Sequence, residues 1–349
     1  MGLPFKDIAR GQPIRWADLS GRAVAVDAYN ALYQFLATIR QADGQPFSDP
    51  EGRPTSHLIG TLYRTTSLLA AGVRPAWVFD GHPPSRKAGT IRDRIAAKER
   101  ARQAWDEALA AGDWETARRK ASQTSRLTAP MVEETVALLK ALGMPAVRAP
   151  GEGEAQAAIL AAEGTVWATA SEDYDTLLFG APRLVRGLAA RRGHGAEDAA
   201  TLIDRARWLE ELGISADELI LMGILVGTDF NEGVRGIGPK KALRLVQQHL
   251  GWDETVRRAG LDPVEAGEVA AIFRTPSATP GLTLRFGEPD PEAVVRLLVD
   301  GHGFAEARVR GALARLGTGP KRATAAPPGT ETVRRRQAVL DGYAEGSPG

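Results

Sequence analysis

Short apolar runs, each followed by acidic residues, alternate with helical patterns along this chain. The clearest are Ala23–Asp27, Pro75–Asp80 and Val166–Ala170, the last leading into Ser171–Asp175. Short apolar runs bounded by turn residues are typical of strands buried on both faces of a parallel sheet. Their alternation with helices predicts an α/β fold, in which a mostly parallel central sheet is flanked by helices and joined by right-handed crossovers.

Acidic residues follow these strands at the edge of the sheet where α/β proteins bind ligands. The stretch Pro150–Asp175 contains two pairs of acidic residues with i,i+2 spacing, Glu152 with Glu154 and Asp173 with Asp175. Uncompensated carboxylates repel one another, and a hard cation with oxygen ligands relieves the repulsion. The pattern favours a magnesium site, with ordinary solvated loop charges as the alternative for this stretch alone.

The composition narrows the possible chemistry. The chain has no cysteine, which excludes disulfides, thiolate zinc sites and cysteine nucleophiles. Its five histidines are scattered without ligand spacing, so any metal must be held mainly by oxygen. The apolar fraction of 43% and charged fraction of 25% are typical of soluble globular proteins. Because no run approaches the ~18 apolar residues of a membrane span and no signal peptide is evident, we expect a cytoplasmic protein without membrane contact.

The net charge of +1 conceals two basic clusters. Residues 86–102 carry seven basic residues against two acidic ones, within a helical insertion predicted over Arg86–Leu127 with a bend at Ala111–Trp114. The second cluster contains Lys240 and Lys241. Basic clusters beside a carboxylate site suggest a polyanion that meets metal ions. A solvated helix face is the alternative for either cluster alone.

Two glycines, Gly236 and Gly238, precede a predicted helix that begins near Lys240. They allow a tight turn that exposes backbone N–H groups and a positive helix end to an anion, such as a DNA phosphate. The spacing does not match a phosphate-binding Walker A loop. A plain helix cap is the alternative.

The remaining predicted elements complete the alternating pattern. Thr55-Ser56 is a predicted N-cap. Residues 187–200 are predicted as a loop, and the residues after 316 have a disordered composition. Helices are expected over 29–40, 56–71, 131–142, 205–212 and 217–226, and further strands over 145–149 and 184–186.

An ordered set of motifs in this chain resembles the flap endonucleases, the structure-specific 5′-nucleases of DNA replication and repair, most closely those of archaeal type. The resemblance spans about residues 1–316. The motifs are Ala25–Ala31, Thr55–Leu58, Val78–Gly81, Gly151–Ala157, Ser171–Asp175, Leu225–Asp229 and Gly236–Lys241.

The resemblance implies a site for two Mg²⁺ ions, with Mn²⁺ as an alternative, that cleaves a phosphodiester bond. Among its ligands, Glu154 and Asp173 are expected to bind metal directly, and others largely through bound water. The seven carboxylates that match the family's metal ligands are Asp27, Asp80, Glu152, Glu154, Asp173, Asp175 and Asp229.

The resemblance also implies DNA-contacting residues. Lys87 and Arg94 would contact the scissile phosphate, with surface charge as the alternative. Tyr33 would stack on a base near the cut, with a core tyrosine as the alternative. Arg40 matches the end of a wedge that separates two duplex arms, and Arg64 is a further expected DNA contact.

Two further elements concern DNA and partner binding. Gly233–Leu243, with Gly236, Gly238, Lys240 and Lys241, matches a helix–two-turn–helix element that grips duplex backbone, with K⁺ as a candidate ion. Gln337–Ala344 resembles a sliding-clamp-binding box, weakened because Ala344 replaces an aromatic residue; a tail without a partner is the alternative.

The expected activity is 5′-flap endonuclease with 5′-exonuclease action, in Okazaki fragment maturation and repair. The expected substrate is branched DNA with a 5′ flap, and the expected state is a monomer, associated with the nucleoid if archaeal. A catalytically silent junction binder and a nuclease for bubbles or four-way junctions are the alternatives. The expected regions are 1–97 (nuclease), 98–128 (helical cap), 129–230 (nuclease, completing the site), 231–316 (helix–two-turn–helix and C-terminal helices) and 317–349 (tail).

Overall fold

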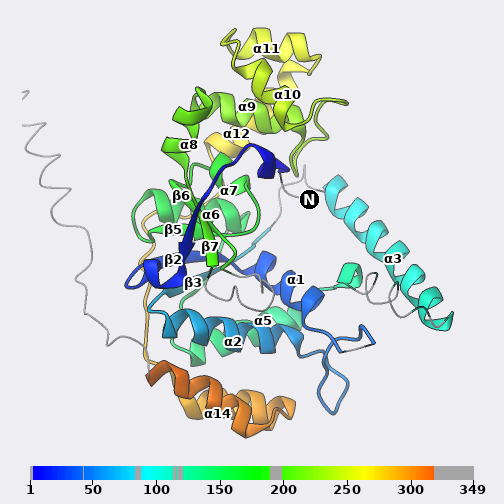
Figure 1. The fold of residues 1–349 in the computed structure, drawn as a ribbon, viewed down its shortest axis with the longest axis vertical. Helices are drawn as coiled ribbons and strands as arrows, with labels where there is room; N and C mark the ends of the chain where they lie inside the picture. The colour runs from blue at the N-terminus through cyan, green and yellow to red at the C-terminus, as the bar shows by residue number, and fades with distance from the viewer. Residues whose placement is uncertain are drawn as a thin grey trace, which may run out of the picture.

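A seven-stranded sheet lies at the centre of the computed structural model (Figure 1). The structure describes residues 3–41, 43–82, 88–111, 113, 116, 120, 122–188 and 199–317. The strand order is β1-β7-β6-β5-β2-β3-β4. The strands are β1 (Gln12–Arg15), β2 (Ala23–Asp27), β3 (Arg74–Phe79), β4 (Ala146–Arg148), β5 (Ala168–Ala170), β6 (Arg183–Arg186) and β7 (Ala199–Asp204).

Five neighbouring strands, β6, β5, β2, β3 and β4, pair in parallel, so the predicted mostly parallel α/β sheet is confirmed. The strand β7 pairs antiparallel with both β6 and β1. Strands β1 and β7 were not predicted, and the loop predicted to reach residue 200 was wrong at its end, because β7 begins at Ala199. Strand β1 forms the edge of the sheet and leaves three of its four residues exposed, whereas β7 is paired on both sides; neither has the continuous apolar run that marks a strand buried on both faces.

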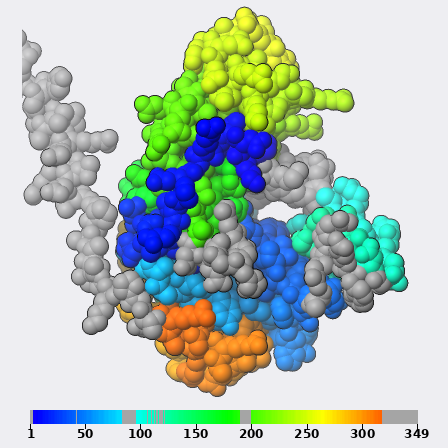
Figure 2. Space-filling model, viewed as in Figure 1, coloured from blue at the N-terminus to red at the C-terminus, as the bar shows by residue number. Residues whose placement is uncertain are grey.

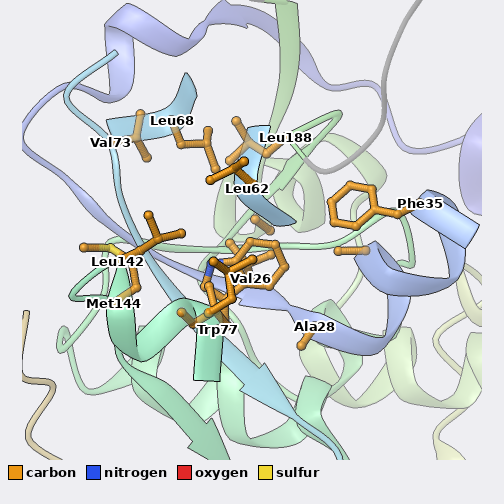
Figure 3. Packing of buried hydrophobic residues seen from close by; sticks show 14 of the residues in the cluster. Val26, Ala28, Phe35, Leu62, Leu68, Val73, Trp77, Leu142, Met144 and Leu188 are labelled. Carbon is orange, nitrogen blue, oxygen red and sulfur yellow. The ribbon is translucent and has the colours of Figure 1, made fainter. Parts of the chain in front are cut away.

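Helices α1 (Ala28–Thr38), α2 (Ser56–Ala70) and α5 (Ala129–Ala141) cover one face of the sheet. Figure 3 shows their contact with the strands: Leu62, Leu142 and Phe35 pack around Val26 and Trp77. The C-terminal helices α13 (Pro291–Val295) and α14 (Glu306–Ala314) pack on α5 and α2 and extend this first core.

On the other face, α6 (Gly153–Ala162) packs Ala157 and Leu160 against Ala25 and Val78. A second large core joins the helices that follow β5 with the N-terminal residues Leu3 and Phe5. It extends into the end of the molecule shown in yellow in Figure 1. Its helices are α7 (Asp175–Leu178), α8 (Arg205–Leu212), α9 (Ala216–Val226), α10 (Pro239–Val246), α11 (Trp252–Ala259) and α12 (Pro263–Arg274).

Helix α3 (Ala88–Ala110) is long and poor in large apolar residues, as predicted. It projects at one side of the molecule, as Figure 2 shows in cyan. The predicted bend begins where α3 ends at Ala110, although part of it lies outside the described residues. No helix in the described ranges is long and apolar enough to cross a membrane.

The predicted N-cap at Thr55-Ser56 was wrong in its chemistry, because no side chain caps α2. The Ser56 hydroxyl instead donates to Ile39 O at 2.7 Å and accepts from Phe47 N at 3.1 Å. Ser56 therefore connects the loop before α2 to the end of α1. The local cap pattern does not predict this contact between distant residues.

Candidate active site

The first two acids stand at the ends of adjacent parallel strands. Asp27 is the last residue of β2, is only 7% exposed, and caps α1 by accepting the Asn30 N–H at 3.0 Å. Its other carboxylate oxygen accepts the Ser171 hydroxyl at 3.1 Å. Asp80 directly follows β3 and accepts the Gly153 N–H at 2.7 Å. These bonds join the carboxyl ends of β2 and β3 to the segments that carry the other acids.

The glutamate pair lies at the start of α6, where the helix dipole favours negative charge. Glu152 is the N-cap residue and is buried, and Glu154 lies in the first turn. Between them, Gly153 allows close approach of another acid, because a Cβ at this position would lie only 2.8 Å from Asp80 Oδ1. Because position 153 is a glycine, the Asp80 carboxylate can lie directly against the first residue of α6.

The remaining acids come from two segments of the second core. Asp173 lies between β5 and α7, and Asp175 is the first residue of α7. The backbone N–H of Leu3 donates to Oδ1 of both, at 3.2 Å and 3.4 Å. Asp229 follows α9 and is 9% exposed.

Electrostatics show that these acids lie close together. Burial, then the charge of Asp80 and that of Asp173, raises the pKa of Asp27 to about 7. Burial, then the charges of Asp173 and Asp229, raises the pKa of Asp175 well above its usual value. Burial and the charge of Asp229 also raise the pKa of Asp173. Five aspartates from four segments of the chain therefore repel one another within one site.

The donors of this site suit a hard divalent cation, because they are carboxylate oxygens and their mutual repulsion would be relieved by positive charge. Within the described residues, no three carboxylate or histidine side chains are placed as ligands of a single ion. The chemistry of the donors thus fits Mg²⁺ or Mn²⁺.

The structure places two expected DNA-contacting side chains on the first core's helices. Tyr33 on α1 is 36% exposed, so the alternative of a core tyrosine was wrong. The Lys98 ammonium of α3 lies 4.2 Å from the centre of its ring, a cation–π contact between the projecting helix and the body. Arg64 on α2 lies with its guanidinium 4.9 Å from the ring centre of Trp16.

Arg40 already makes three contacts within the protein. Its guanidinium donates to Leu36 O and Gly44 O, both at 2.8 Å, and to Ser125 Oγ at 3.0 Å. These bonds tie the end of α1 to the following loop and to the segment that returns from α3. The resemblance had indicated a DNA contact here and gave no sign of this structural role.

Of the expected phosphate-contacting pair, Lys87 lies outside the described residues. Arg94 lies on α3, and its side chain is likewise outside them. The expected tight turn before α10 is present: Gly236 has a positive φ of 82°, and Gly238 is the N-cap residue. Lys240 and Lys241 lie in the first turn of α10, where Lys241 Nζ donates to Gly236 O at 3.4 Å.

Comparison with known proteins identifies the family. Residues 6–101 match the XPG N-terminal domain and residues 143–229 match the XPG I-region. Flap endonuclease 1 of Aeropyrum pernix is 46% identical over 356 residues, covering 98% of this chain and 99% of that protein. The Pyrococcus abyssi protein is 44% identical over 324 residues, covering 90% and 94%. The chain belongs to the flap endonuclease family.

Solved structures agree with this flap endonuclease assignment. Flap endonuclease-1 from Methanococcus jannaschii superposes with a TM-score of 0.72 at 40% identity, covering 90% of this chain and 98% of that one. The catalytic core of Rad2 in complex with DNA substrate has a TM-score of 0.68 at 25% identity, covering 90% and 100%. The expected family, fold and enzyme class are confirmed: this is a structure-specific flap endonuclease, a hydrolase acting on DNA phosphodiester bonds. Roles in DNA replication and repair are typical of the family.

Three features of the site were missed at the level of sequence. The Leu3 backbone amide reaches two acids that lie about 170 residues away along the chain. The Ser171 hydroxyl donates to Asp27, a contact that the motif Ser171–Asp175 does not predict. Arg186, at the end of β6, contacts both neighbours of Asp173. None of the three carries a local signal, because each contact joins segments distant in sequence.

Proposed function

We propose that the seven carboxylates hold two Mg²⁺ ions, with Mn²⁺ as a substitute, and that phosphodiester hydrolysis takes place beside them. The observation that carries this proposal is the gathering of five mutually repelling aspartates, three of them buried, at the carboxyl edge of the sheet. When bound, such a pair of ions supplies an activated water and stabilises the leaving oxygen.

Within that site the side chains have different tasks. Glu154 and Asp173 would bind the metal directly, while Asp27, Asp80 and Glu152 would act largely through water, since Mg²⁺ keeps much of its hydration. The hydrogen bonds from Asn30, Ser171 and Gly153 support this division, because they fix the orientation of Asp27 and Asp80. Lys87 and Arg94 contact the scissile phosphate and offset its developing charge.

The preferred substrate is branched DNA with a 5′ flap, cut near the junction, with 5′-exonuclease action as a second activity. The exposed Tyr33 ring stacks on a base beside the cut. Arg40 and Arg64 contact duplex near α1 and α2. The turn at Gly236 and Gly238, with Lys240 and Lys241, grips the phosphate backbone of the other duplex arm, with K⁺ as its ion.

Several broader proposals rest on the family resemblance. The enzyme acts as a monomer in Okazaki fragment maturation and repair and, if it is archaeal, is associated with the nucleoid. Residues 98–128 form the cap through which the flap passes, and residues 231–316 form the helix–two-turn–helix and the C-terminal helices. Gln337–Ala344, which lie outside the described residues, bind a sliding clamp weakly because of Ala344.

The deciding experiment compares labelled flap, nicked, bubble and four-way DNA with Mg²⁺ or EDTA. We expect fast cutting of the flap near its junction, little cutting of the other three, and none with EDTA. Equal cutting of all four substrates would contradict the flap preference. Binding of flap DNA without any cutting would indicate a silent junction binder.

The site assignment is tested by Glu154→Ala and Asp175→Asn. Each is expected to lower the single-turnover rate by about 10³-fold or more, as for loss of a central electrostatic group. Affinity for flap DNA, measured in Ca²⁺, is expected to persist. Asp253→Asn, at an exposed acid on α11, is the matched control and is expected to cut at the wild-type rate. Normal cutting by either site variant would refute the assignment.

A further inference from the structure

Arg186 ends strand β6 beside the loop that carries Asp173 and Asp175, and its guanidinium makes several contacts with that loop. Its Nε and Nη2 donate to the carbonyl oxygen of Glu172 at 3.2 Å and 2.9 Å. Its Nη1 donates to the Tyr174 hydroxyl, and the guanidinium lies over the Tyr174 ring at 4.3 Å. The residues on both sides of Asp173 are therefore fastened to one arginine.

The Glu172 side chain strengthens the same connection. Its Oε1 accepts the Gly187 N–H at 2.6 Å, and its Oε2 lies 3.5 Å from Arg186 Nη2. The side chains of this ion pair are only 19% and 23% exposed, so water screens the contact weakly. Glu172 itself was not assigned as a ligand, and these contacts explain why an acid stands there.

The loop that contains Glu172 and Tyr174 holds two carboxylates side by side. The backbone N–H of Leu3 donates to Oδ1 of both Asp173 and Asp175, at 3.2 Å and 3.4 Å, so these two like charges lie next to each other and repel. Such carboxylates separate unless the backbone that carries them is held in place. On the Asp27 side, the Ser171 hydroxyl donates to Asp27 and accepts the Asp173 N–H at 3.1 Å. Arg186 holds the opposite side of the loop.

We propose that Arg186 is a positioning residue for the metal site, which holds the backbone of Asp173 and Asp175 in place through Glu172 and Tyr174. The inference rests on the proposed metal-binding function. It requires an arginine, since only a planar fork of donors can bond a carbonyl and a hydroxyl at once while stacking on a ring. Groups that orient metal ligands in this way typically contribute 10- to 100-fold to metal affinity or activity.

The same strand offers a matched control. Arg183 begins β6, and its guanidinium lies 5.0 Å from the ring centre of Trp167 and 3.8 Å from the carboxylate of Asp204. It thus has the same kinds of partner as Arg186, at the end of the strand away from the acids. Arg183→Met removes a similar set of contacts without touching the site.

The first measurement is Mn²⁺ binding to the full chain without DNA, followed by the electron paramagnetic resonance signal of free Mn²⁺. We expect Arg186→Met to weaken binding by about 10- to 100-fold. Tyr174→Phe keeps the ring and its packing on Phe5 but loses the hydroxyl, so a smaller loss in the same direction is expected. Arg186→Lys is expected to rescue binding only in part, and Arg183→Met to bind as wild type.

The second measurement is single-turnover cleavage of flap DNA at increasing Mg²⁺. For Arg186→Met the half-saturating Mg²⁺ concentration is expected to rise by a similar factor, with much of the rate regained at high Mg²⁺. A purely structural role would lower the rate at every concentration without this shift. Asp173→Asn, measured in parallel, tests the metal site itself.

The outcomes separate the two proposals. If Asp173→Asn weakens Mn²⁺ binding and folded Arg186→Met does not, the positioning role is refuted while the metal site stands. Equal losses in Arg186→Met and Arg183→Met would refute it as well. If Asp173→Asn leaves Mn²⁺ binding unchanged, the proposed metal site fails. Should Arg186→Met not fold, wild-type Mn²⁺ binding by Tyr174→Phe would overturn the positioning role.

Discussion

The carboxylate of Asp80 accepts a 2.7 Å hydrogen bond from the backbone N–H of Gly153, which joins the end of β3 to the first residue of α6. Asp80 Oδ1 would lie only 2.8 Å from a Cβ at position 153, so the contact requires glycine. This hydrogen bond fixes the position of Asp80 relative to Glu152 and Glu154, the two glutamates on either side of Gly153.

Gly153→Ala is therefore expected to displace Asp80 and to lower the single-turnover cleavage rate by about 10- to 100-fold. In an open helix the same change stabilises by about 1 kcal/mol, but here the steric conflict cancels that gain. Gly267→Ala on α12, where nothing lies within 4 Å of the new Cβ, is the control. It is expected to raise the free energy of unfolding and to cut normally. Full activity in Gly153→Ala would contradict the role of the contact.

Asp27 serves both as an acid of the site and as the N-cap of α1, and two substitutions separate these tasks. Asp27→Asn keeps a capping oxygen and removes a buried, repelled charge, so we expect the free energy of unfolding in metal-free buffer to rise by about 1 kcal/mol. Cleavage is expected to fall by about 10²- to 10³-fold. Asp27→Ala is expected to lose the cap, at about 1 kcal/mol of stability relative to Asp27→Asn. Urea unfolding measures the stability of both variants, and single-turnover assays measure their cleavage rates. A lower free energy of unfolding in Asp27→Asn than in the wild type would contradict the proposal that the Asp27 charge is repelled in the native protein.

The contact of Lys98 with the Tyr33 ring holds α3 against α1. Lys98→Met is expected to remove about 0.5–1 kcal/mol of this attraction. Amide hydrogen exchange in α3 is then expected to accelerate about 2- to 5-fold, while exchange in α2 stays unchanged. Tyr33→Phe, which keeps the ring face, is expected to exchange as wild type. Equal acceleration in α2 would show a global rather than a local effect.

A buried polar network links α2 and α5 to the C-terminal segment. His57 Nε2 lies 2.9 Å from Glu134 Oε2, and His302 Nδ1 lies 3.2 Å from Asp49 Oδ2, which also bonds Arg53. Burial lowers the pKa of His57 in spite of its bond to Glu134. The unfolded chain therefore binds a proton more readily than the native protein, and stability is lost as the pH falls below about 6.5.

His57→Gln removes this proton and is expected to reduce the loss of unfolding free energy between pH 7 and pH 5. The reduction in slope is at most about 1.4 kcal/mol per pH unit, the value for a single proton. Urea unfolding followed by tryptophan fluorescence gives the slope. An unchanged slope in His57→Gln would show that the native histidine titrates as it does in the unfolded chain.

Much of the site was predictable because the acids occupy positions with a local signal. Asp27 and Asp80 end apolar strands, and the carboxyl ends of parallel strands meet at one edge of a sheet. The glutamate pair at the start of α6 was equally visible. The electrostatic coupling of Asp173, Asp175 and Asp229 then follows from the fold.

What escaped prediction depends on contacts between distant segments. The strand β1 has no apolar alternation, and its place is set by pairing with β7 some 190 residues later. Arg40 and Arg186 look alike in sequence, as cations near the ends of elements. One fastens a helix end to its loop, and the other clamps the loop that carries two acids. No local pattern distinguishes these roles.

The acids are divided between the two large cores: the neighbours of Asp27 belong to the first, whereas those of Asp175 and Asp229 belong to the second. The spacing of these acids therefore depends on how the two cores sit against each other. Catalytic sites tolerate displacements of only about 0.5 Å. On warming, a slight slip between the cores would stop cleavage while each core remained packed, so the temperature at which activity ends would lie below the temperature at which the chain unfolds.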